Sequence, residues 1–370
     1  MFLTSTELQQ RITDTIALLQ VPGVGRGRFS KLVKQFGTPS DVFERSLGDL
    51  ETVTGISRTI ATAIKSAHDK EAARTIYARI AQLGWEILFP EHAEYPKPLC
   101  TIPDSPPLIF RVGLPWTPDD KMIAIVGTRH ASEKGRQFTT TLAGELTRAG
   151  MTIVSGMAEG IDSAAHIGAL DAGGKTVAVW GTPLNLVYPP INRGLAERIG
   201  KTGSVYSEYF PDTRVDPAYF PERNRIISGL SEGTIVVEAG RKSGALITAS
   251  CAVAQGRELF AVPGAPDNPH SLGTNALIKN GARLLTEAQD LFDEIPRLRG
   301  EVTARRFQAL PDLTDTEKRV VSAMVGGPFQ LDQLSRLVEL PVAELMEYLL
   351  ALELKGVVQE LSGKRFGLSD

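Results

Sequence analysis

The chain has 370 residues, of which 40 are basic and 43 acidic, and 42% of its residues are hydrophobic. These values predict a globular protein of roughly two or three domains, and they exclude one that attracts nucleic acid by overall charge alone. The two cysteines, Cys100 and Cys251, lie far apart and form no Cys-x-x-Cys pattern, so neither a disulfide framework nor a thiolate metal site is indicated and we expect a reducing compartment. No apolar run reaches the ~18–20 residues of a membrane span and no signal peptide is evident, so we expect a cytoplasmic protein.

Residues 1–72 are predicted to form a helical domain. Gly-containing turns at 21–29 and 50–57 each precede a short helix, and the two units resemble paired helix-hairpin-helix motifs. Such turns offer backbone amides to nucleic-acid phosphates. The first turn and its helix are basic and carry no acid; three interpretations stay open for them, namely DNA contact, a solvated face, and packing onto the next domain. The cations concerned are Arg26, Arg28, Lys31 and Lys34.

Residues 73–118 are predicted to form a connecting subdomain that packs on the domain after it. A helix to residue 83 leads to strand-like segments at 85–89 and 108–112, with a proline-rich stretch between them.

Residues 119–296 alternate short apolar strands with helices. The strands are predicted at 122–127, 151–155, 176–180, 204–207, 234–238 and 258–262. Continuous apolar strands joined by helical crossovers are typical of a parallel sheet covered on both faces, so we predict a doubly wound, Rossmann-like α/β fold. A ligand is then expected beyond the carboxyl ends of the strands, near a topological switch point.

A linker at 297–311 is predicted to lead to a winged-helix domain at 312–370, with three helices and a closing hairpin. Over 311–370 the chain has 6 basic and 10 acidic residues. The shape is typical of DNA binding, but an acidic recognition surface would repel phosphates, so the charge favours contact with protein.

Glycine is concentrated in the Rossmann-like region, with 22 of the 35 glycines between positions 113 and 281. Several follow predicted strands, where a missing Cβ would let the backbone approach a ligand. The first strand ends in Gly127, Thr128 and Arg129, which suit a phosphate through amides, a hydroxyl and a cation. The alternative is that Arg129 pairs with a surface carboxylate.

The second strand ends in Ser155 and Gly156, which we also predict to contact phosphate. Asp162 and His166 follow at helical i, i+4 spacing. They could form an acid–base pair, but no third ligand supports a metal site, and the favoured interpretation is a helix cap and an internal hydrogen bond.

Aromatic, amide and guanidinium groups come together in the helix start Phe220, Arg223, Asn224 and Arg225. Stacking on Phe220, hydrogen bonding by Asn224 and charge from Arg223 suit a strand of nucleic acid. For Arg225, closer to the core, a structural ion pair is an equal alternative.

A further group of anion-binding residue types follows the strand at 234–238: Arg241, Lys242, Ser243 and Gly244. Glu238 beside them is either a general base or a residue that holds the loop. A similar turn and helix start follow the last strand, at 263–275. Residues 119–290 have 17 basic and 18 acidic residues, so a nucleic-acid site requires the cations to converge in space.

The motifs IAIVGTRHAS (123–132), SGMAEGIDSAAHIGAL (155–170), FPERNRIISGLS (220–231) and EAGRKSGALITA (238–249) together resemble the DprA/Smf family of DNA-processing proteins. The resemblance implies a Rossmann-like domain that binds single-stranded DNA, dimerises and loads the RecA recombinase during natural transformation, without catalysis, cofactor or metal. It implies DNA contact by residues 127–129, 155–156, 220–225 and 243–244, beside Lys242, which the residue pattern itself makes a candidate for DNA contact. Many members carry a lysine after the Tyr-Pro turn, where this chain has Pro190 after Tyr188 and Pro189; Arg193 is the candidate substitute.

A rival prediction is a nucleotide-hydrolysing enzyme of the lysine-decarboxylase-like (LOG) Rossmann group. Those enzymes use a Pro-Gly-Gly-x-Gly-Thr-x-x-Glu loop. The corresponding stretch here, EAGRKSGALIT, has no Gly-Gly pair and no glutamate on the following helix, which argues against hydrolysis.

Overall fold

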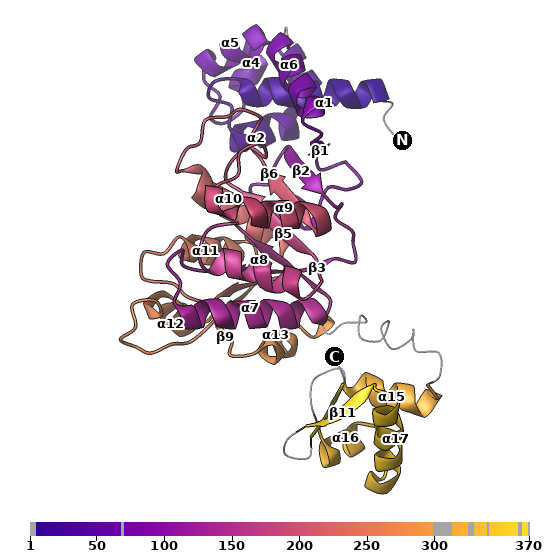
Figure 1. Cartoon of the computed structure of the whole chain (residues 1–370). Helices are drawn as coiled ribbons and strands as arrows, with labels where there is room; N and C mark the ends of the chain where they lie inside the picture. Colours follow the sequence, from indigo (N-terminus) through magenta and orange to yellow (C-terminus); the bar gives the residue numbers. More distant parts are fainter. Residues whose placement is uncertain are drawn as a thin grey trace. The chain divides into compact units, whose positions relative to one another are not determined.

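The computed structural model describes residues 5–67, 70–298, 313–324, 329–338, 340–361 and 365–368. It divides into two compact units, one of Met1–Thr147 with Thr152–Leu284 and one of Arg148–Met151 with Leu285–Asp370 (Figure 1). We call them the sheet unit and the winged-helix unit and describe each by itself. The predicted linker at 297–311 lies outside the described residues from position 299 onward.

The sheet unit is built on nine strands in the order β1-β2-β6-β5-β4-β3-β7-β8-β9. Five pairs of neighbouring strands are parallel: β6 with β5, β5 with β4, β3 with β7, β7 with β8, and β8 with β9. The strands are β1 Glu86–Leu88, β2 Ile109–Gly113, β3 Lys121–Val126, β4 Met151–Ser155, β5 Thr176–Trp180, β6 Ser204–Ser207, β7 Gly233–Val236, β8 Glu258–Ala261 and β9 Arg283–Leu284. The predicted doubly wound α/β fold is confirmed.

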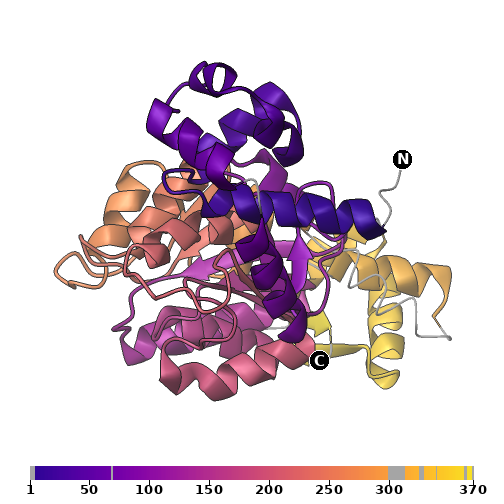
Figure 2. The ribbon, with the colours of Figure 1, turned by 90° about the horizontal axis from the view of Figure 1, so that it is seen from above.

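Helices cover both faces of this sheet. In Figure 2 the magenta helices α7 and α8 lie on one side and the orange helices α11 and α12 on the other. Helix α10 packs against α11. The helices are α7 Glu133–Arg148, α8 Ile161–Asp171, α9 Arg193–Thr202, α10 Tyr219–Leu230, α11 Ala245–Ala254 and α12 Leu272–Lys279. This two-sided cover is why the central strands β3, β4 and β5 are buried apart from Lys121 and are mostly apolar.

The strand order places a switch point at the carboxyl end of β3. The chain passes from β3 to β4 on one side of it and returns later to β7 on the other side. The connections that follow β3 and β7 therefore run in opposite directions, and a crevice opens beyond the carboxyl ends of these two strands.

The segment predicted as a connecting subdomain instead extends the sheet. Strand β2 pairs antiparallel with both β1 and β6. The apolar pattern predicts strands here but no partner for them, because antiparallel edge pairing depends on contacts with β6, nearly a hundred residues further along the chain. The ring of Phe110 on β2 contacts Trp85 and Phe210, with centroids 5.8 and 5.5 Å away.

The first part of the chain is helical, as predicted. Its helices are α1 Ser5–Gln20, α2 Arg26–Phe36, α3 Pro39–Glu44, α4 Leu47–Glu51, α5 Arg58–Ser66 and α6 Glu71–Gln82. Thr38 and Ser46 each begin a short helix with a capping box, which satisfies amides that a helix start leaves unpaired. The helical core is continuous with Trp85 and Phe110, so this part and the sheet share one apolar cluster.

The basic turn before α2 is engaged within the sheet unit. Arg26 pairs with Glu222 on α10 at 3.1 Å and with Glu208 at 3.4 Å. The Arg28 guanidinium donates to the carbonyl oxygens of Gly23 and Gly55, at 2.7 and 2.8 Å. Of the three interpretations offered for this turn, packing onto the next part of the chain accounts for Arg26.

Asp162 and His166 on α8 are both buried. His166 Nδ1 lies 2.7 Å from the Thr176 hydroxyl, and burial lowers the pKa of His166 from 6.5 to about 3. The carboxylate of Asp162 accepts a hydrogen bond from the Ala158 amide at 3.3 Å. No hydrogen bond joins the two side chains, and no group of three metal-binding side chains occurs in the described ranges. His166 has the predicted internal hydrogen bond, while the position that caps α8 is Gly160 rather than Asp162.

The winged-helix unit contains helices α13 Ala288–Glu294, α15 Asp315–Ala323, α16 Leu331–Val338 and α17 Val342–Leu354 and strands β10 Phe329–Gln330, β11 Val358–Leu361 and β12 Arg365–Leu368. The strands form an antiparallel sheet in the order β10-β12-β11. Leu334, Leu345, Leu349 and Phe366 lie in its apolar core. The predicted three helices and hairpin are present, and the short strand β10 was not predicted. Among the helices that the structure describes in either unit, none is long and apolar enough to cross a membrane.

We predict that Phe110→Ala lowers the free energy of unfolding of the sheet unit by about 3–5 kcal/mol, the usual cost of truncating a fully buried phenylalanine. Urea unfolding followed by tryptophan fluorescence measures this, because all three tryptophans (Trp85, Trp116 and Trp180) belong to that unit. Leu114→Ala, at a side chain that is 40% exposed, is the matched control and should cost about 0.5 kcal/mol or less. Equal effects of the two substitutions would contradict the shared core.

We also predict that His166 makes the sheet unit lose stability in mild acid. The folded-state pKa is depressed, so the unfolded chain takes up a proton below pH 6.5 that the folded chain refuses until about pH 3. The stability linked to neutral His166 is therefore present at pH 7 and is lost as the pH falls. At pH 5 this loss lowers the free energy of unfolding by about 2 kcal/mol. In the same urea assay His166→Gln should lose about 2 kcal/mol less than the unmodified protein between pH 7 and pH 5. Parallel pH profiles would show that His166 titrates normally.

Candidate nucleic-acid interface

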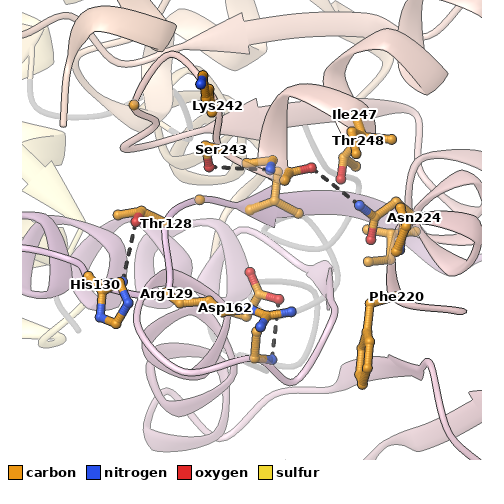
Figure 3. Close-up of a pocket in the computed structure, with 18 of the residues that line it drawn as sticks. Thr128, Arg129, His130, Asp162, Phe220, Asn224, Lys242, Ser243, Ile247 and Thr248 are labelled. Carbon is orange, nitrogen blue, oxygen red and sulfur yellow. Dashed lines mark hydrogen bonds between the residues drawn. The ribbon is translucent and has the colours of Figure 1, made fainter. Parts of the chain in front are cut away.

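A cleft of about 600 Å³ opens at the switch point, beyond the carboxyl ends of β3 and β7 (Figure 3). Three segments supply most of its wall: the turn after β3, the start of α10, and the loop from β7 into α11. The predicted residues that line it are Gly127, Thr128, Arg129, Phe220, Arg223, Asn224, Lys242, Ser243 and Gly244. The sequence therefore identified both the place and most of the wall of this cleft.

Arg129 and Phe220 form one side of the cleft. The Arg129 guanidinium carbon lies 5.6 Å from the centroid of the Phe220 ring, a cation–π distance. The Tyr188 ring lies 5.2 Å from Phe220 and is 44% exposed. A cation and two aromatic rings are thus adjacent and reachable from solvent.

Lys242, Ser243 and Gly244 form the opposite side. The Ser243 hydroxyl accepts from the Ala245 amide at 3.4 Å, and the amides of Leu246 and Ile247 are already bonded to the carbonyls of Ser243 and Gly244. The predicted cradle of helix-start amides is therefore largely occupied. Lys242 and the Ser243 hydroxyl proton remain for an anion, and a Cβ on Gly244 would meet nothing within 4 Å.

The two exposed cations of the cleft are not neutralised within the described ranges. No carboxylate oxygen there lies within 4.0 Å of the charged nitrogens of Arg129 or Lys242. Arg129 therefore does not form the surface ion pair considered as its alternative with any carboxylate that the structure describes.

Arg223 lies beneath the cleft and is 4% exposed. Its guanidinium donates to the carbonyl oxygens of Gly156, at 2.6 Å, and Val179. Burial lowers the pKa of Arg223 to about 10, so it is still charged at neutral pH. Burial also raises the pKa of Asp162, and the positive charge of Arg223 opposes this upward shift in part. Arg223 therefore builds the floor and adds positive potential, rather than presenting an open guanidinium as predicted.

Asn224 is held at the cleft wall by its neighbours. Its side-chain oxygen accepts from Arg223 Nε at 3.2 Å, and its nitrogen donates to the Gly244 carbonyl at 3.4 Å. The long second bond leaves an amide that can exchange Gly244 for a ligand acceptor.

Arg225 and Ser155 do not reach the cleft. Arg225 is buried and pairs with Glu208, so the structural alternative holds for it. Ser155 is fully buried, and its hydroxyl donates to the Ile125 carbonyl at 2.6 Å. Both predictions of DNA contact are corrected, because sequence position alone does not reveal which side of a strand end or helix faces the core.

Two glycines predicted to let a ligand approach are required by packing. A Cβ on Gly127 would lie 2.4 Å from a side-chain carbon of Ile161, and one on Gly156 would lie 2.7 Å from both Arg223 and Asp162. Glu238 holds a loop, as one of its two interpretations predicted, because its carboxylate accepts from the Ser132 amide and hydroxyl at 2.9 and 2.6 Å.

Arg193 and Arg241 are exposed but are not among the residues that line the cleft. Arg193 is the first residue of α9, after the 3-10 turn η3 (Pro190–Asn192). The lining also includes Asp162, which the sequence assigned to a helix cap, and four residues that the sequence did not single out: His130, Ile247, Thr248 and His270. Only the likeness of the turn before α12 to the other strand-end turns pointed toward His270.

Family models match two regions of the chain: DNA recombination-mediator protein A over residues 86–296, and the DprA winged helix domain over residues 304–364. The protein Smf of Synechocystis is 32% identical, over 95% of this chain and 97% of its own length. The DNA processing protein DprA of Bacillus subtilis is 43% identical, over 55% of this chain and 69% of its own.

Two solved structures are similar in fold. The X-ray structure of DprA from Streptococcus pneumoniae has a TM-score of 0.66 and 33% identity and covers 80% of this chain and 99% of its own. The DprA structure from Helicobacter pylori, described for the single-stranded DNA binding mode of that protein, has a TM-score of 0.51 and 30% identity, with coverage of 58% and 96%. Together with the family models, these matches place the chain in the DprA/Smf family of DNA recombination-mediator proteins.

Proposed function

We propose that this chain is a DNA-processing protein that binds single-stranded DNA in the switch-point cleft. The observation that carries the proposal is that two cations without a described carboxylate partner, Arg129 and Lys242, share one crevice with the Phe220 ring. Cations that follow a backbone and rings on which bases stack are the combination used to bind single strands. The relative from Helicobacter pylori, whose structure describes such binding, supports it.

A single strand suits the cleft better than a duplex. Phe220 in the cleft and Tyr188 beside it offer aromatic rings, and a base can stack on a ring only when it has left its own helix. A paired base would have to be extracted first, at a cost of a few kcal/mol. We therefore expect a clear preference for single-stranded over double-stranded DNA of the same sequence.

We further propose that the protein passes the bound strand to the RecA recombinase during natural transformation, in the cytoplasm, as a homodimer formed through the Rossmann-like region. Family membership supports these steps. Sedimentation of the full chain tests the dimer, and filament formation by RecA on coated single strands tests the loading.

We propose no catalytic role for the cleft. Two residues that the sequence offered for proton transfer, Glu238 and His166, are otherwise engaged, since Glu238 is bonded to Ser132 and His166 is buried at a depressed pKa. The alternative, nucleotide hydrolysis of the LOG type, predicts ribose release from AMP. We expect none, and sustained release that tracks the purified protein would favour the enzyme.

Arg129→Ala and Lys242→Ala should each weaken single-strand affinity by about 1–3 kcal/mol, the scale of one good nucleic-acid contact. Each should also reduce the slope of log affinity against log salt by about 0.7, because one phosphate contact is lost. Titration of a labelled oligothymidine at several salt concentrations measures both quantities. Arg241→Ala is the matched control, since it removes the neighbouring exposed cation outside the cleft and should change little. An equal effect of all three would mean that only general charge matters.

Phe220→Ala should act differently from the cation substitutions. We expect a loss of about 1–3 kcal/mol from base stacking. The salt slope should stay unchanged, because no phosphate contact is removed. The same titration distinguishes the two classes, with Phe220→Tyr as the control that keeps the ring. If Phe220→Ala bound single-stranded DNA with unchanged affinity, stacking on Phe220 would be removed from the proposal.

A further inference from the structure

Helix α17 of the winged-helix unit carries an apolar ridge on its outer side. Four side chains spaced four residues apart are exposed: Val342 (40%), Met346 (40%), Leu350 (59%) and Leu354 (84%). Residues at i and i+4 lie one above another on a helix, so these four form one continuous row. We call it the α17 ridge.

The fold of the unit does not need the α17 ridge. The core is served by Leu345, Leu349 and Leu352, which are fully buried on another side of the same helix. A helix that is apolar on its core side and also on its outer side is typical of one with a further packing partner. Contiguous exposed apolar rows usually mark interaction sites.

The charges beside the ridge exclude nucleic acid as its partner. Helix α17 is the third of the three consecutive helices α15, α16 and α17 and so occupies the place of the recognition helix, yet its sequence VAELMEYLLALEL contains no lysine or arginine. Glu344, Glu347 and Glu353 are exposed on it. Phosphates at the ridge would meet the flanking carboxylates of Glu347 and Glu353 and no cation of α17.

The same charges disfavour a second copy of this chain. Two ridges packed face to face would bring four carboxylates, Glu347 and Glu353 of each copy, along one seam with no lysine or arginine of α17 to offset them. Like charges across an interface cost free energy and are a common means of excluding a wrong partner. Charge complementarity therefore selects a cationic occupant.

We propose that the α17 ridge docks a basic amphipathic helix of another protein. The partner helix supplies its own row of apolar side chains at i and i+4, and its flanking lysines or arginines face Glu347 and Glu353. Interdigitation of two such rows gives a crossing angle of about −50°. The site is separate from the DNA cleft and does not depend on the proposed function.

The test uses the full chain and a fluorescently labelled 18-residue helix of alanine, leucine and lysine, with leucines in an i, i+4 row and lysines beside it. We expect saturable binding by fluorescence anisotropy at about 0.15 M salt. Leu350→Ser should weaken it at least tenfold, whereas Val253→Ser, at a 63% exposed position of the sheet unit, should leave it unchanged. Circular dichroism checks that each variant is folded.

A second variant and a second peptide keep the outcome decisive. Glu347→Lys should weaken binding of the basic peptide and favour a glutamate-for-lysine version of it. A scrambled peptide of the same composition, which lacks the apolar row, should bind at least tenfold more weakly. The proposal is overturned if the scrambled peptide binds equally or Leu350→Ser has no effect. It is also overturned if Leu350→Ser abolishes self-association or duplex binding instead, since the occupant is then a second copy or DNA.

Discussion

The cleft depends on one buried guanidinium. Arg223 extends from α10 to the carbonyl oxygens of Gly156, just after β4, and Val179, in β5, and thereby ties the helix across the ends of two strands. A buried charge is tolerated only when hydrogen bonds and opposite charge replace water, and the two carbonyls together with nearby Asp162 provide this. The same helix then presents Phe220 and Asn224 to the cleft and Glu222 to Arg26. One interaction therefore aligns the aromatic wall, the floor and the contact with the helical region.

The division of labour among the cations follows from their exposure. Arg223 and Arg225 satisfy interior carbonyls and a carboxylate, so they organise structure. Arg129 and Lys242 stand at the opening without a described carboxylate partner, so they keep their charge for a ligand. This explains how a region with no net excess of positive charge can still attract a polyanion at one place.

Strand positions, the doubly wound fold and the location of the cleft could all be predicted, because buried parallel strands are apolar and their carboxyl ends gather at one edge. The roles of individual side chains were harder to predict from the sequence. Arg223, Asn224 and Arg225 are consecutive, yet one forms the floor, one the wall and one an internal ion pair. Helix rotation decides this, and neighbours far along the chain set that rotation. Gly127 and Gly156 are glycines because Ile161, Arg223 and Asp162 crowd them, which only the packed structure reveals.

The central claim is that a single strand lies in this cleft, between the Arg129–Phe220 side and the Lys242 side. Photo-crosslinking of an oligothymidine that carries 4-thiothymidine, followed by mass spectrometry of the linked peptides, tests it most directly. The account predicts crosslinks in peptides that contain residues 127–130, 220–224 and 242–248. Crosslinks confined to the basic turn at 26–34 or to the winged-helix unit, with none at the cleft, would contradict it.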